Sequence, residues 1–423
     1  MAAAVIAANV IGLVITIVFA RLLGASGYGS LAALMSAFII LMVPGSALQI
    51  AVAREVSRDA GGPDAGAGVR RWLARLAVAA LVVAALAIPL RGAIAAAIGV
   101  EEEWGAAAVP VTAMLWTLLS VIRGALQGFG LYRTVALSII GEGVGRLVLG
   151  LALVGVGLDV TGAFLGTPLS MLAVAAALAP WLRPHLPASA GAGVARLRDL
   201  LAGARAPVAG LTLLFVLQEV HVIVVKHEAS GDAAGSYAVA AVAAKAIIWV
   251  AVGLGLYLLP EVARRAASGV DGRPVLSRTL GLIALLGVPM VLVYAVAGEP
   301  LLRLVFGDDL TEASGALPVL GLAMTLLACT YLSVQYLLGL HRAAFVWMLA
   351  VAAAVEILLL VWIPADLERI ALALLAVQAV SAAVLVTLSF RTGPGKSEHR
   401  VGAEPGDRGV ATREVAVEHA HSA

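Results

Sequence analysis

The sequence predicts an all-α polytopic membrane protein in which 12 transmembrane helices form two pseudo-symmetric six-helix bundles. Three observations predict this fold class: a very apolar composition, long uninterrupted hydrophobic runs, and an internal repeat. Of the 423 residues, 62% are hydrophobic and 13% are charged, whereas charged residues make up about a quarter of a typical soluble chain. With a mean hydropathy of +1.03, the composition excludes an ordinary soluble protein.

The hydrophobic runs have the length of membrane-spanning helices. Residues 1–390 divide into 12 units of about 32 residues, each holding one span of about 20 residues and a short loop. Runs such as Leu76 to Pro89 show no alternation of apolar and polar residues, so an outer-membrane β-barrel is excluded. We expect spans at about Ala2–Ala20, Ser30–Ala53, Trp72–Ile98, Gly105–Ile122, Val135–Gly155, Thr161–Leu182, Pro207–Val225, Gly235–Leu259, Leu280–Ala297, Gly315–Leu338, Ala343–Ile363 and Ile370–Phe390.

The distribution of Lys and Arg predicts the orientation, because cytoplasmic loops of membrane proteins are enriched in these residues. On these spans, 21 of the 28 Lys and Arg residues lie on one side, five lie on the other, and two lie within spans. We therefore expect a multi-pass protein of the plasma (inner) membrane with both termini in the cytoplasm. The first span has no basic segment before it and no A-x-A site, so it is not expected to be a cleaved signal peptide.

Four pairs of segments recur in the same order at nearly one spacing. Tyr28 recurs as Tyr237 and Gly130-Leu-Tyr-Arg133 as Gly339-Leu-His-Arg342, both at an offset of 209 residues. Pro110-Val111 recurs as Pro318-Val319 at 208, and Glu55-Val-x-Arg58 as Glu261-Val-x-Arg264 at 206. Transporters are often built from such repeats. Because each repeat holds an even number of spans, the two halves are expected to be related by an axis along the membrane normal.

The repeat sets the expected domain boundaries. These are residues 1–182 for the N-terminal six-helix bundle, 183–206 for a cytoplasmic or interfacial linker, 207–390 for the C-terminal bundle and 391–423 for a disordered cytoplasmic tail. In the linker, Val194, Leu197, Leu200 and Leu201 fall on one helical face. This pattern predicts either a short helix on the anionic membrane surface or a solvated linker.

Several motifs resemble those of a known family. Ala20-Arg-Leu-Leu-Gly-Ala-Ser-Gly-Tyr-Gly29, Gly130-Leu-x-Arg133 and Leu304-Val-Phe-Gly307 resemble segments of the oligosaccharide and polysaccharide flippases (Wzx-like) of the multidrug/oligosaccharidyl-lipid/polysaccharide (MOP) exporter superfamily. The resemblance covers about residues 1–390. It implies a V-shaped pair of bundles, as in MATE and other MOP proteins, that moves an isoprenoid-pyrophosphate-linked saccharide from the cytoplasmic to the outer leaflet.

Ionisable residues inside the spans are the candidate functional residues, because a charge costs about 2.5–3.5 kcal/mol in mid-span on insertion scales. Five fall there: Glu142, Arg146, Glu219, Lys245 and Glu356. Our hypothesis is that Arg146 and Lys245 bind a diphosphate, while Glu219 or Glu356 binds a coupling proton or cation. The competing interpretation is structural, since Glu142 and Arg146 are spaced to neutralise each other on one helix face.

Three further residues belong to this set with weaker support. His221 is either a proton relay or a hydrogen-bonded core residue. Arg21 and Arg54, at the ends of the first two spans, either contact substrate phosphates or anchor the span ends. We predict no catalytic residues, no metal ligands and no cofactor, because the loops are too short to build an enzyme site.

The sequence therefore favours a lipid-linked glycan flippase that works by alternating access in cell-surface polysaccharide biosynthesis. The alternatives are a cation-coupled multidrug or metabolite antiporter of the same superfamily, and a non-transporting polymerase, glycosyltransferase subunit or scaffold. The expected partners are the lipid-linked glycan, membrane lipids, and glycosyltransferases or a polymerase of the same pathway. No nucleic-acid partner is expected, and no feature of the sequence specifies an oligomeric state.

Overall fold

A computed structural model describes residues 2–58, 63–186, 205–229, 231–363 and 366–393. These residues form α-helices joined by short loops and contain no strand. The helices are α1 (Ala2–Arg58), α2 (Pro63–Ala87), α3 (Arg91–Ile98), α4 (Glu103–Gly128), α5 (Tyr132–Leu153), α6 (Asp159–Leu182), α8 (Arg205–Glu228), α9 (Gly231–Ala244), α10 (Ala246–Ala267), α11 (Arg273–Phe306), α12 (Leu317–Gly339), α13 (Phe345–Trp362) and α14 (Leu367–Arg391). The helix expected around Val194–Leu201 and nearly all of the expected tail lie outside the described residues.

The expected set of spans is present in the described helices. Nine helical segments are long and apolar enough to cross a membrane, and two of them, of 55 and 54 residues, each contain two of the expected spans. The first of these breaks at Gly24, which has a φ of 68°. The second turns between α5 and α6 at Gly157 and Asp159, where φ is also positive. With the bent pair α2 and α3 counted as one further span, the described helices account for all 12.

Two expected spans are not continuous helices. The span expected at Trp72–Ile98 bends by 85° between α2 and α3. The span expected at Gly235–Leu259 is interrupted at Lys245, which separates α9 from α10. Uniform hydrophobicity predicts that a segment inserts but gives no information about breaks, because a break depends on tertiary contacts that replace the lost helical hydrogen bonds.

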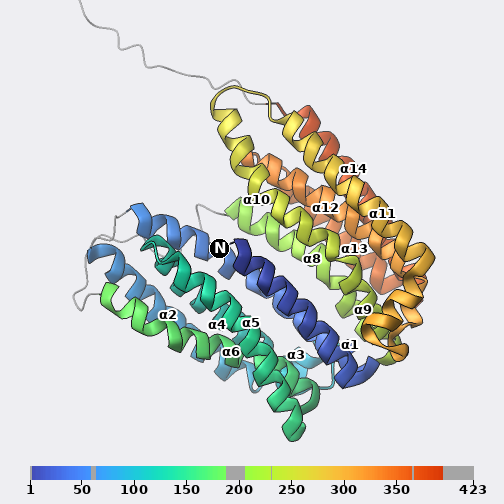
Figure 1. The fold of residues 1–423 in the computed structure, drawn as a ribbon, viewed down its shortest axis with the longest axis horizontal. Coiled ribbons are helices and arrows are strands. Elements are labelled where there is room, and N and C mark those ends of the chain that lie inside the picture. The colour runs from blue at the N-terminus through green and yellow to red at the C-terminus, as the bar shows by residue number, and fades with distance from the viewer. Residues whose placement is uncertain (1, 59–62, 187–204, 230, 364–365, 394–423) are drawn as a thin grey trace, which may run out of the picture.

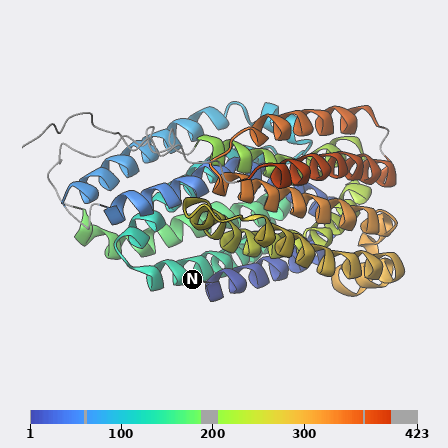
Figure 2. The same ribbon diagram turned by 90° about the horizontal axis from the view of Figure 1, so that it is seen from above.

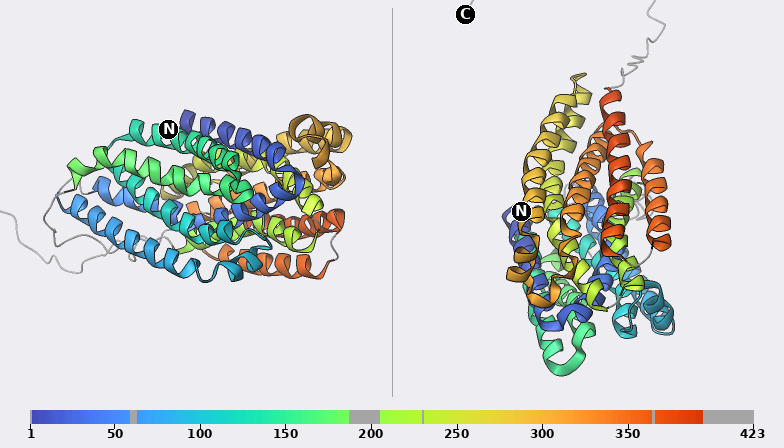
Figure 3. Two further views of the ribbon diagram at one scale, coloured as in Figure 1. Left: turned by 90° about the horizontal axis from the view of Figure 1, so that it is seen from below. Right: turned by 90° about the vertical axis from the view of Figure 1, so that its right-hand side faces the viewer.

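The helices form two groups that correspond to the two halves of the sequence. Figure 1 shows α2 and α4–α6 on one side, α10–α14 on the other, and α1 and α8 between them. Figure 2 shows that most helices run roughly parallel to one another, and Figure 3 shows the same bundles from below and from one end. Between the groups, α1 contacts α8 and α9 extensively. The fold is therefore the predicted pair of helical bundles.

The sequence repeat is also visible in matching contacts. Arg58 lies 3.9 Å from Glu55 near the end of α1, and its repeat counterpart Arg264 lies 2.8 Å from Glu261 near the end of α10. Both pairs are three residues apart on a helix. The same local salt bridge thus occurs at the corresponding end of each half.

The two halves meet most closely at a seam of small residues between α1 and α9. A side chain at Gly29 would lie 2.9 Å from the backbone nitrogen of Gly235. A side chain at Gly235 would overlap the carbonyl group of Ala25. Only glycine permits so close an approach of the two backbones. This seam lies near the ends of the spans that the charge distribution predicts to be extracellular.

Candidate functional site

The centre of the first polar cluster is the carboxylate of Glu219 on α8. Its Oε2 atom accepts hydrogen bonds from Lys245 Nζ at 2.8 Å and from Ser36 Oγ at 2.8 Å, and Oε1 accepts one from Gln218 Nε2 at 2.9 Å. The side chains of Glu219 and Lys245 are only 3% and 10% exposed. A buried charge pair of this kind needs additional hydrogen bonds to offset its desolvation, and Ser36 and Gln218 supply them.

The break between α9 and α10 lies at Lys245, a member of this cluster. The hydroxyl group of Tyr294 on α11 donates to the carbonyl of Ala243 at 2.7 Å. This bond satisfies one backbone group that the interrupted helix leaves free. The result is that Lys245 occupies the junction of the two helices, with its ammonium group directed at Glu219.

Ser36 and Lys245 are counterparts in the repeat, since they are separated by the same 209 residues as Tyr28 and Tyr237. They come from different halves of the chain, yet both donate to the same atom, Glu219 Oε2. Glu219 therefore lies where equivalent positions of the two halves converge. The cluster is a contact between the halves as well as a charge pair.

His221 extends this cluster along α8. Its Nε2 atom lies 2.9 Å from the carbonyl oxygen of Gln218, so Nε2 must carry the proton, and its Nδ1 atom then accepts from the Tyr237 hydroxyl at 3.0 Å. Both ring nitrogens are engaged, and the residue is fully buried. This environment matches the hydrogen-bonded core residue that the sequence left as one of two interpretations.

Glu356 on α13 forms a second buried acidic site in the C-terminal half. Its Oε2 atom accepts from Gln378 Nε2 on α14 at 2.9 Å, and Gln378 also donates to the Leu217 carbonyl at 3.4 Å. The Oε1 atoms of Glu356 and Gln378 are buried and have no hydrogen-bond partner. Glu356 is 0% exposed and forms no ion pair with the described residues. Such a carboxyl group is compatible with membrane burial only if it binds a proton or another cation.

The N-terminal half contains a cluster of opposite character. Glu142 on α5 lies 2.9 Å from Arg123 Nη1 and 3.5 Å from Arg146 Nη2. Arg123 also donates to the hydroxyl and the carbonyl of Ser138 at 3.0 and 2.9 Å. One carboxylate is thus shared by two guanidinium groups, which leaves an excess positive charge.

Of the two arginines in this cluster, Arg146 is the one whose side chain is partly exposed. Its side chain is 24% exposed, against 3% for Arg123. Its Nε atom has no hydrogen-bond partner within the described part of the chain. The pairing of Arg146 with Glu142 that the sequence predicts is present, but the shorter and more buried contact of Glu142 is the one with Arg123.

Arg123 is the functional candidate that the sequence reading missed. We expected the span to end at Ile122 and counted Arg123 among the loop cations, whereas α4 continues to Gly128 and buries Arg123. The apolar residues after it, Ala125 and Leu126, were the available signal. The guanidinium group lies 5.9 Å from the ring centre of Trp116, close enough for a cation–π contact.

The remaining predicted residues lie apart from both clusters. Arg21 Nη2 donates to the carbonyl of Leu304 at 2.7 Å and Arg21 Nε to that of Val305 at 3.1 Å, near the C-terminal end of α11. This contact joins the two halves close to the glycine seam. Arg54 is exposed toward the other end of α1. The structure therefore distributes the four predicted substrate-binding cations over separate places, and Arg146 and Lys245 belong to different clusters.

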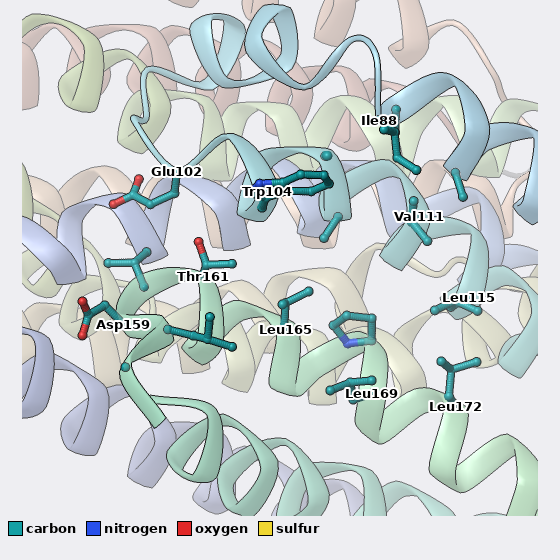
Figure 4. Close-up of a pocket in the computed structure, with 18 residues that line it drawn as sticks. Ile88, Glu102, Trp104, Val111, Leu115, Asp159, Thr161, Leu165, Leu169 and Leu172 are labelled. Atoms are coloured by element: carbon teal, nitrogen blue, oxygen red, sulfur yellow. The ribbon is translucent and has the colours of Figure 1, made fainter. Parts of the chain in front are cut away.

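The described residues contain no group of three or more His, Cys, Asp or Glu side chains that could hold a metal ion. A cavity of about 810 Å³ lies in the N-terminal half between α2, α4 and α6. Figure 4 shows its lining, which includes Trp104, Leu165 and Leu172. None of the predicted site residues lines this cavity.

Comparison with known proteins defines the fold class. No protein family model matches the sequence, and no curated protein matches it. Solved structures do match, and they include multidrug resistance transporters of the MATE family in the MOP superfamily. The fold of this chain is therefore the MATE-type arrangement of two six-helix bundles.

Three of these structures define the similarity more closely. An inward-facing multidrug resistance MATE transporter is 12% identical over 91% of this chain and 94% of its own, with a TM-score of 0.74. The outward-facing form of such a transporter gives 13% identity over 92% of each chain and a TM-score of 0.58. A eukaryotic MATE transporter gives 16% identity over 90% of this chain and 92% of its own, also with a TM-score of 0.58. The predicted fold class is confirmed, whereas the predicted flippase subfamily stays a prediction.

Proposed function

We propose that this protein is a flippase that moves an isoprenoid-pyrophosphate-linked oligosaccharide from the cytoplasmic to the outer leaflet for cell-surface polysaccharide biosynthesis. The observation that carries the proposal is the cation excess of the Arg123–Glu142–Arg146 cluster, in which the Arg146 side chain is 24% exposed and its buried Nε atom has no hydrogen-bond partner within the described residues. Arginine binds phosphate oxygens through paired hydrogen bonds.

Alternating access is the mechanism that we propose for this movement. The glycine seam and the contacts of Arg21 with α11 hold the two halves together near one end of the spans. The higher TM-score with an inward-facing transporter, 0.74 against 0.58 for the outward-facing form, supports a state that is closed at the extracellular end. Opening this end requires separation of the seam and loss of the Arg21 contacts.

The acidic sites of the C-terminal half are the proposed coupling sites. Glu356 lacks a cationic partner among the described residues, and its free Oε1 atom is available to a proton or a monovalent cation. Glu219 is already paired with Lys245, and it sits at the contact between the halves. We therefore assign ion binding to Glu356, and to Glu219 the role of holding the two halves together.

The second candidate function is a cation-coupled multidrug or metabolite antiporter. Two observations favour it: the matching solved structures include multidrug resistance transporters, and the C-terminal half contains two buried carboxyl groups. In this case Glu356 would bind the coupling ion and the Arg123 cluster would be structural. Both candidates are multi-pass transporters, and neither requires an enzyme site.

A transport assay in proteoliposomes distinguishes the two candidates. We expect movement of a fluorescent isoprenyl-diphosphate oligosaccharide to require the protein, and Arg146→Gln to slow it at least tenfold. Arg133→Gln is the matched control, since Arg133 is exposed near the start of the same helix. Uptake of a lipophilic cation by the wild-type protein, with no movement of the glycolipid, would instead establish the antiporter.

Lys245 requires a paired design because its removal alone leaves Glu219 buried without its cation. Lys245→Met combined with Glu219→Gln removes both charges and keeps the pair neutral. If Lys245 binds substrate phosphate, the double variant loses transport while remaining folded in the membrane. Full transport by the double variant would assign Lys245 a structural role only.

On this proposal the protein resides in the plasma membrane with both termini in the cytoplasm, as the charge distribution predicts. Its substrate comes from glycosyltransferases on the cytoplasmic face, and its product is consumed by a polymerase or ligase on the outer face. Labelling of cysteines introduced at Arg91 and Arg273, which belong to opposite predicted faces, tests the orientation.

A further inference from the structure

The cavity in the N-terminal half is a groove with an apolar floor. Helices α2, α4 and α6 line it, through residues that include Ala84, Ala108, Leu115 and Leu165. Its volume of about 810 Å³ lies within the range of about 300–1,000 Å³ that is usual for sites that bind small molecules. The 85° bend between α2 and α3 occurs at this groove, beside Ala87 and Ile88.

The groove is open to the surface that faces lipid. Several large apolar side chains on its lining are exposed, namely Ile88, Trp104, Leu158, Leu169 and Leu172. In a bundle of transmembrane helices, exposed apolar side chains contact lipid chains. A hydrocarbon chain could therefore enter the groove from the bilayer without passing through water.

One end of the groove is acidic. Figure 4 shows Glu102 and Asp159 at the same end of the cavity, on opposite sides of it, with Thr161 nearby. Neither carboxylate pairs with a cation within the described part of the chain, and the Oε2 atom of Glu102 is buried without a hydrogen-bond partner. Asp159 has a φ of 38°, a strained conformation for a residue other than glycine. Strain of this kind is concentrated at functional sites.

A cation lies beside Trp104, which lines the groove two residues after Glu102. The guanidinium carbon of Arg91 is 5.1 Å from the centre of the Trp104 ring, which lines the groove, and its Nε is 2.7 Å from Glu103 Oε2. Arg91 remains 41% exposed. Tryptophan and arginine are typical residues of the region where lipid headgroups lie. The groove thus has two carboxylates that are unpaired among the described residues and, next to Trp104, one part-exposed guanidinium group that is paired with Glu103.

We propose that this groove binds a membrane phospholipid whose headgroup carries a primary ammonium group, as phosphatidylethanolamine does. One acyl chain would lie between α2, α4 and α6, the ammonium group would donate hydrogen bonds to Glu102 and Asp159, and the phosphate would lie near Arg91. The two carboxylates repel an isoprenyl diphosphate, so the groove is separate from the proposed transport pathway. The inference does not depend on the proposed function.

Native mass spectrometry of the full-length protein with added phospholipids tests this inference. We expect the wild-type protein to retain phosphatidylethanolamine in preference to phosphatidylglycerol. The variant Glu102→Gln/Asp159→Asn should bind phosphatidylethanolamine about tenfold more weakly, with phosphatidylglycerol binding unchanged. The control Glu101→Gln/Glu312→Gln removes the same number of acids from the same predicted face, outside the groove lining, and should bind like the wild type.

A second variant tests the groove independently of its charges. Ala108→Phe fills part of the lining, and we expect it to weaken phosphatidylethanolamine binding by a similar factor. Equal binding of phosphatidylethanolamine by the wild type, the acid variant and Ala108→Phe would overturn the proposal. It would also be overturned if the acid variant lost both phospholipids equally, or if an isoprenyl diphosphate lipid displaced phosphatidylethanolamine from the wild type.

Discussion

The two halves of the molecule share a helical arrangement but hold opposite excess charges among their helices. In the N-terminal half, Glu142 is shared by Arg123 and Arg146, so positive charge is in excess. In the C-terminal half, Lys245 neutralises Glu219, while Glu356 has no cationic partner among the described residues. The comparison shows that the two halves have the same helical arrangement although their polar residues within the helices differ.

The clusters also differ in what they connect. Arg123, Glu142 and Arg146 lie on α4 and α5 and bind one another within one half. Glu219 instead accepts a hydrogen bond from Ser36 on α1, in the other half. Movement of the halves relative to one another must therefore alter the environment of Glu219, whereas the arginine cluster can move as a unit.

The largest effect that we expect is from removal of the buried cation in each cluster. Arg123→Met leaves Glu142 buried with only the more distant Arg146, and loss of one partner of a buried pair costs about 3–5 kcal/mol. Lys245→Met should cost less, because Ser36 and Gln218 still donate to Glu219. The free energy of unfolding in mixed micelles measures both. An equal loss in the two variants would contradict the comparison.

The same substitution at an acid should have different effects in the two halves. Glu142→Gln removes the charge that holds two guanidinium groups, and we expect a loss of about 1–3 kcal/mol. Glu356→Gln replaces a buried carboxyl group that has no cationic partner among the described residues with a neutral amide, so the free energy of unfolding should not decrease. If Glu356 binds the coupling ion, this variant also loses the dependence of transport on that ion. A lower free energy of unfolding for Glu356→Gln would indicate that Glu356 has a cationic partner, and it would contradict the comparison of the two halves.

A substitution at the seam should disturb only the cluster that crosses it. Gly235→Ala places a methyl group against the Ala25 carbonyl, and overpacking of this kind costs about 1–3 kcal/mol. We expect the seam to widen, and a disulfide between cysteines introduced at positions 26 and 231, which face each other across it, to form more slowly in Gly235→Ala than in the protein with glycine at 235. Gly253→Ala is the control, since a side chain there meets nothing within 4 Å. Identical cross-linking in the two variants would contradict the role of the seam.

The smallest effect is expected from Arg21. Arg21→Ala removes two hydrogen bonds to the end of α11, at an exposed position where solvent reduces their value to about 1 kcal/mol. Spin-label distances across the seam should shift toward the separated state. Arg303→Ala is the matched control, because Arg303 pairs with Glu299 and Asp308 within its own half. A shift of equal size in the control would remove Arg21 from the contact between the halves.

The fold could be predicted because its determinants are local in the sequence. Hydropathy locates the spans, and the recurrence of Glu55 and Arg58 as Glu261 and Arg264 indicates the duplication directly. The two interrupted spans could not be predicted in the same way. At the break, the carbonyl of Ala243 accepts a hydrogen bond from Tyr294, which is 49 positions after Lys245 in the sequence.

The polar clusters could be predicted only in part, because their partners include uncharged residues from distant segments. Glu142, Arg146, Glu219, Lys245 and Glu356 were found because a charge within an apolar run is conspicuous. Ser36 and Gln378, which complete two of the sites, are small or neutral and carry no such signal. Arg123 was missed because it follows the last apolar residue of the expected span. Sequence reasoning identified the charges, whereas their connections required the fold.

The convergence of Ser36 and Lys245 on one carboxylate oxygen has a consequence for how duplicated proteins evolve. In the first repeat, the position 209 residues before Glu219 is Val10. The acid is therefore present in only one of the two copies, so the duplicated segments have become different in sequence at the position that joins the halves.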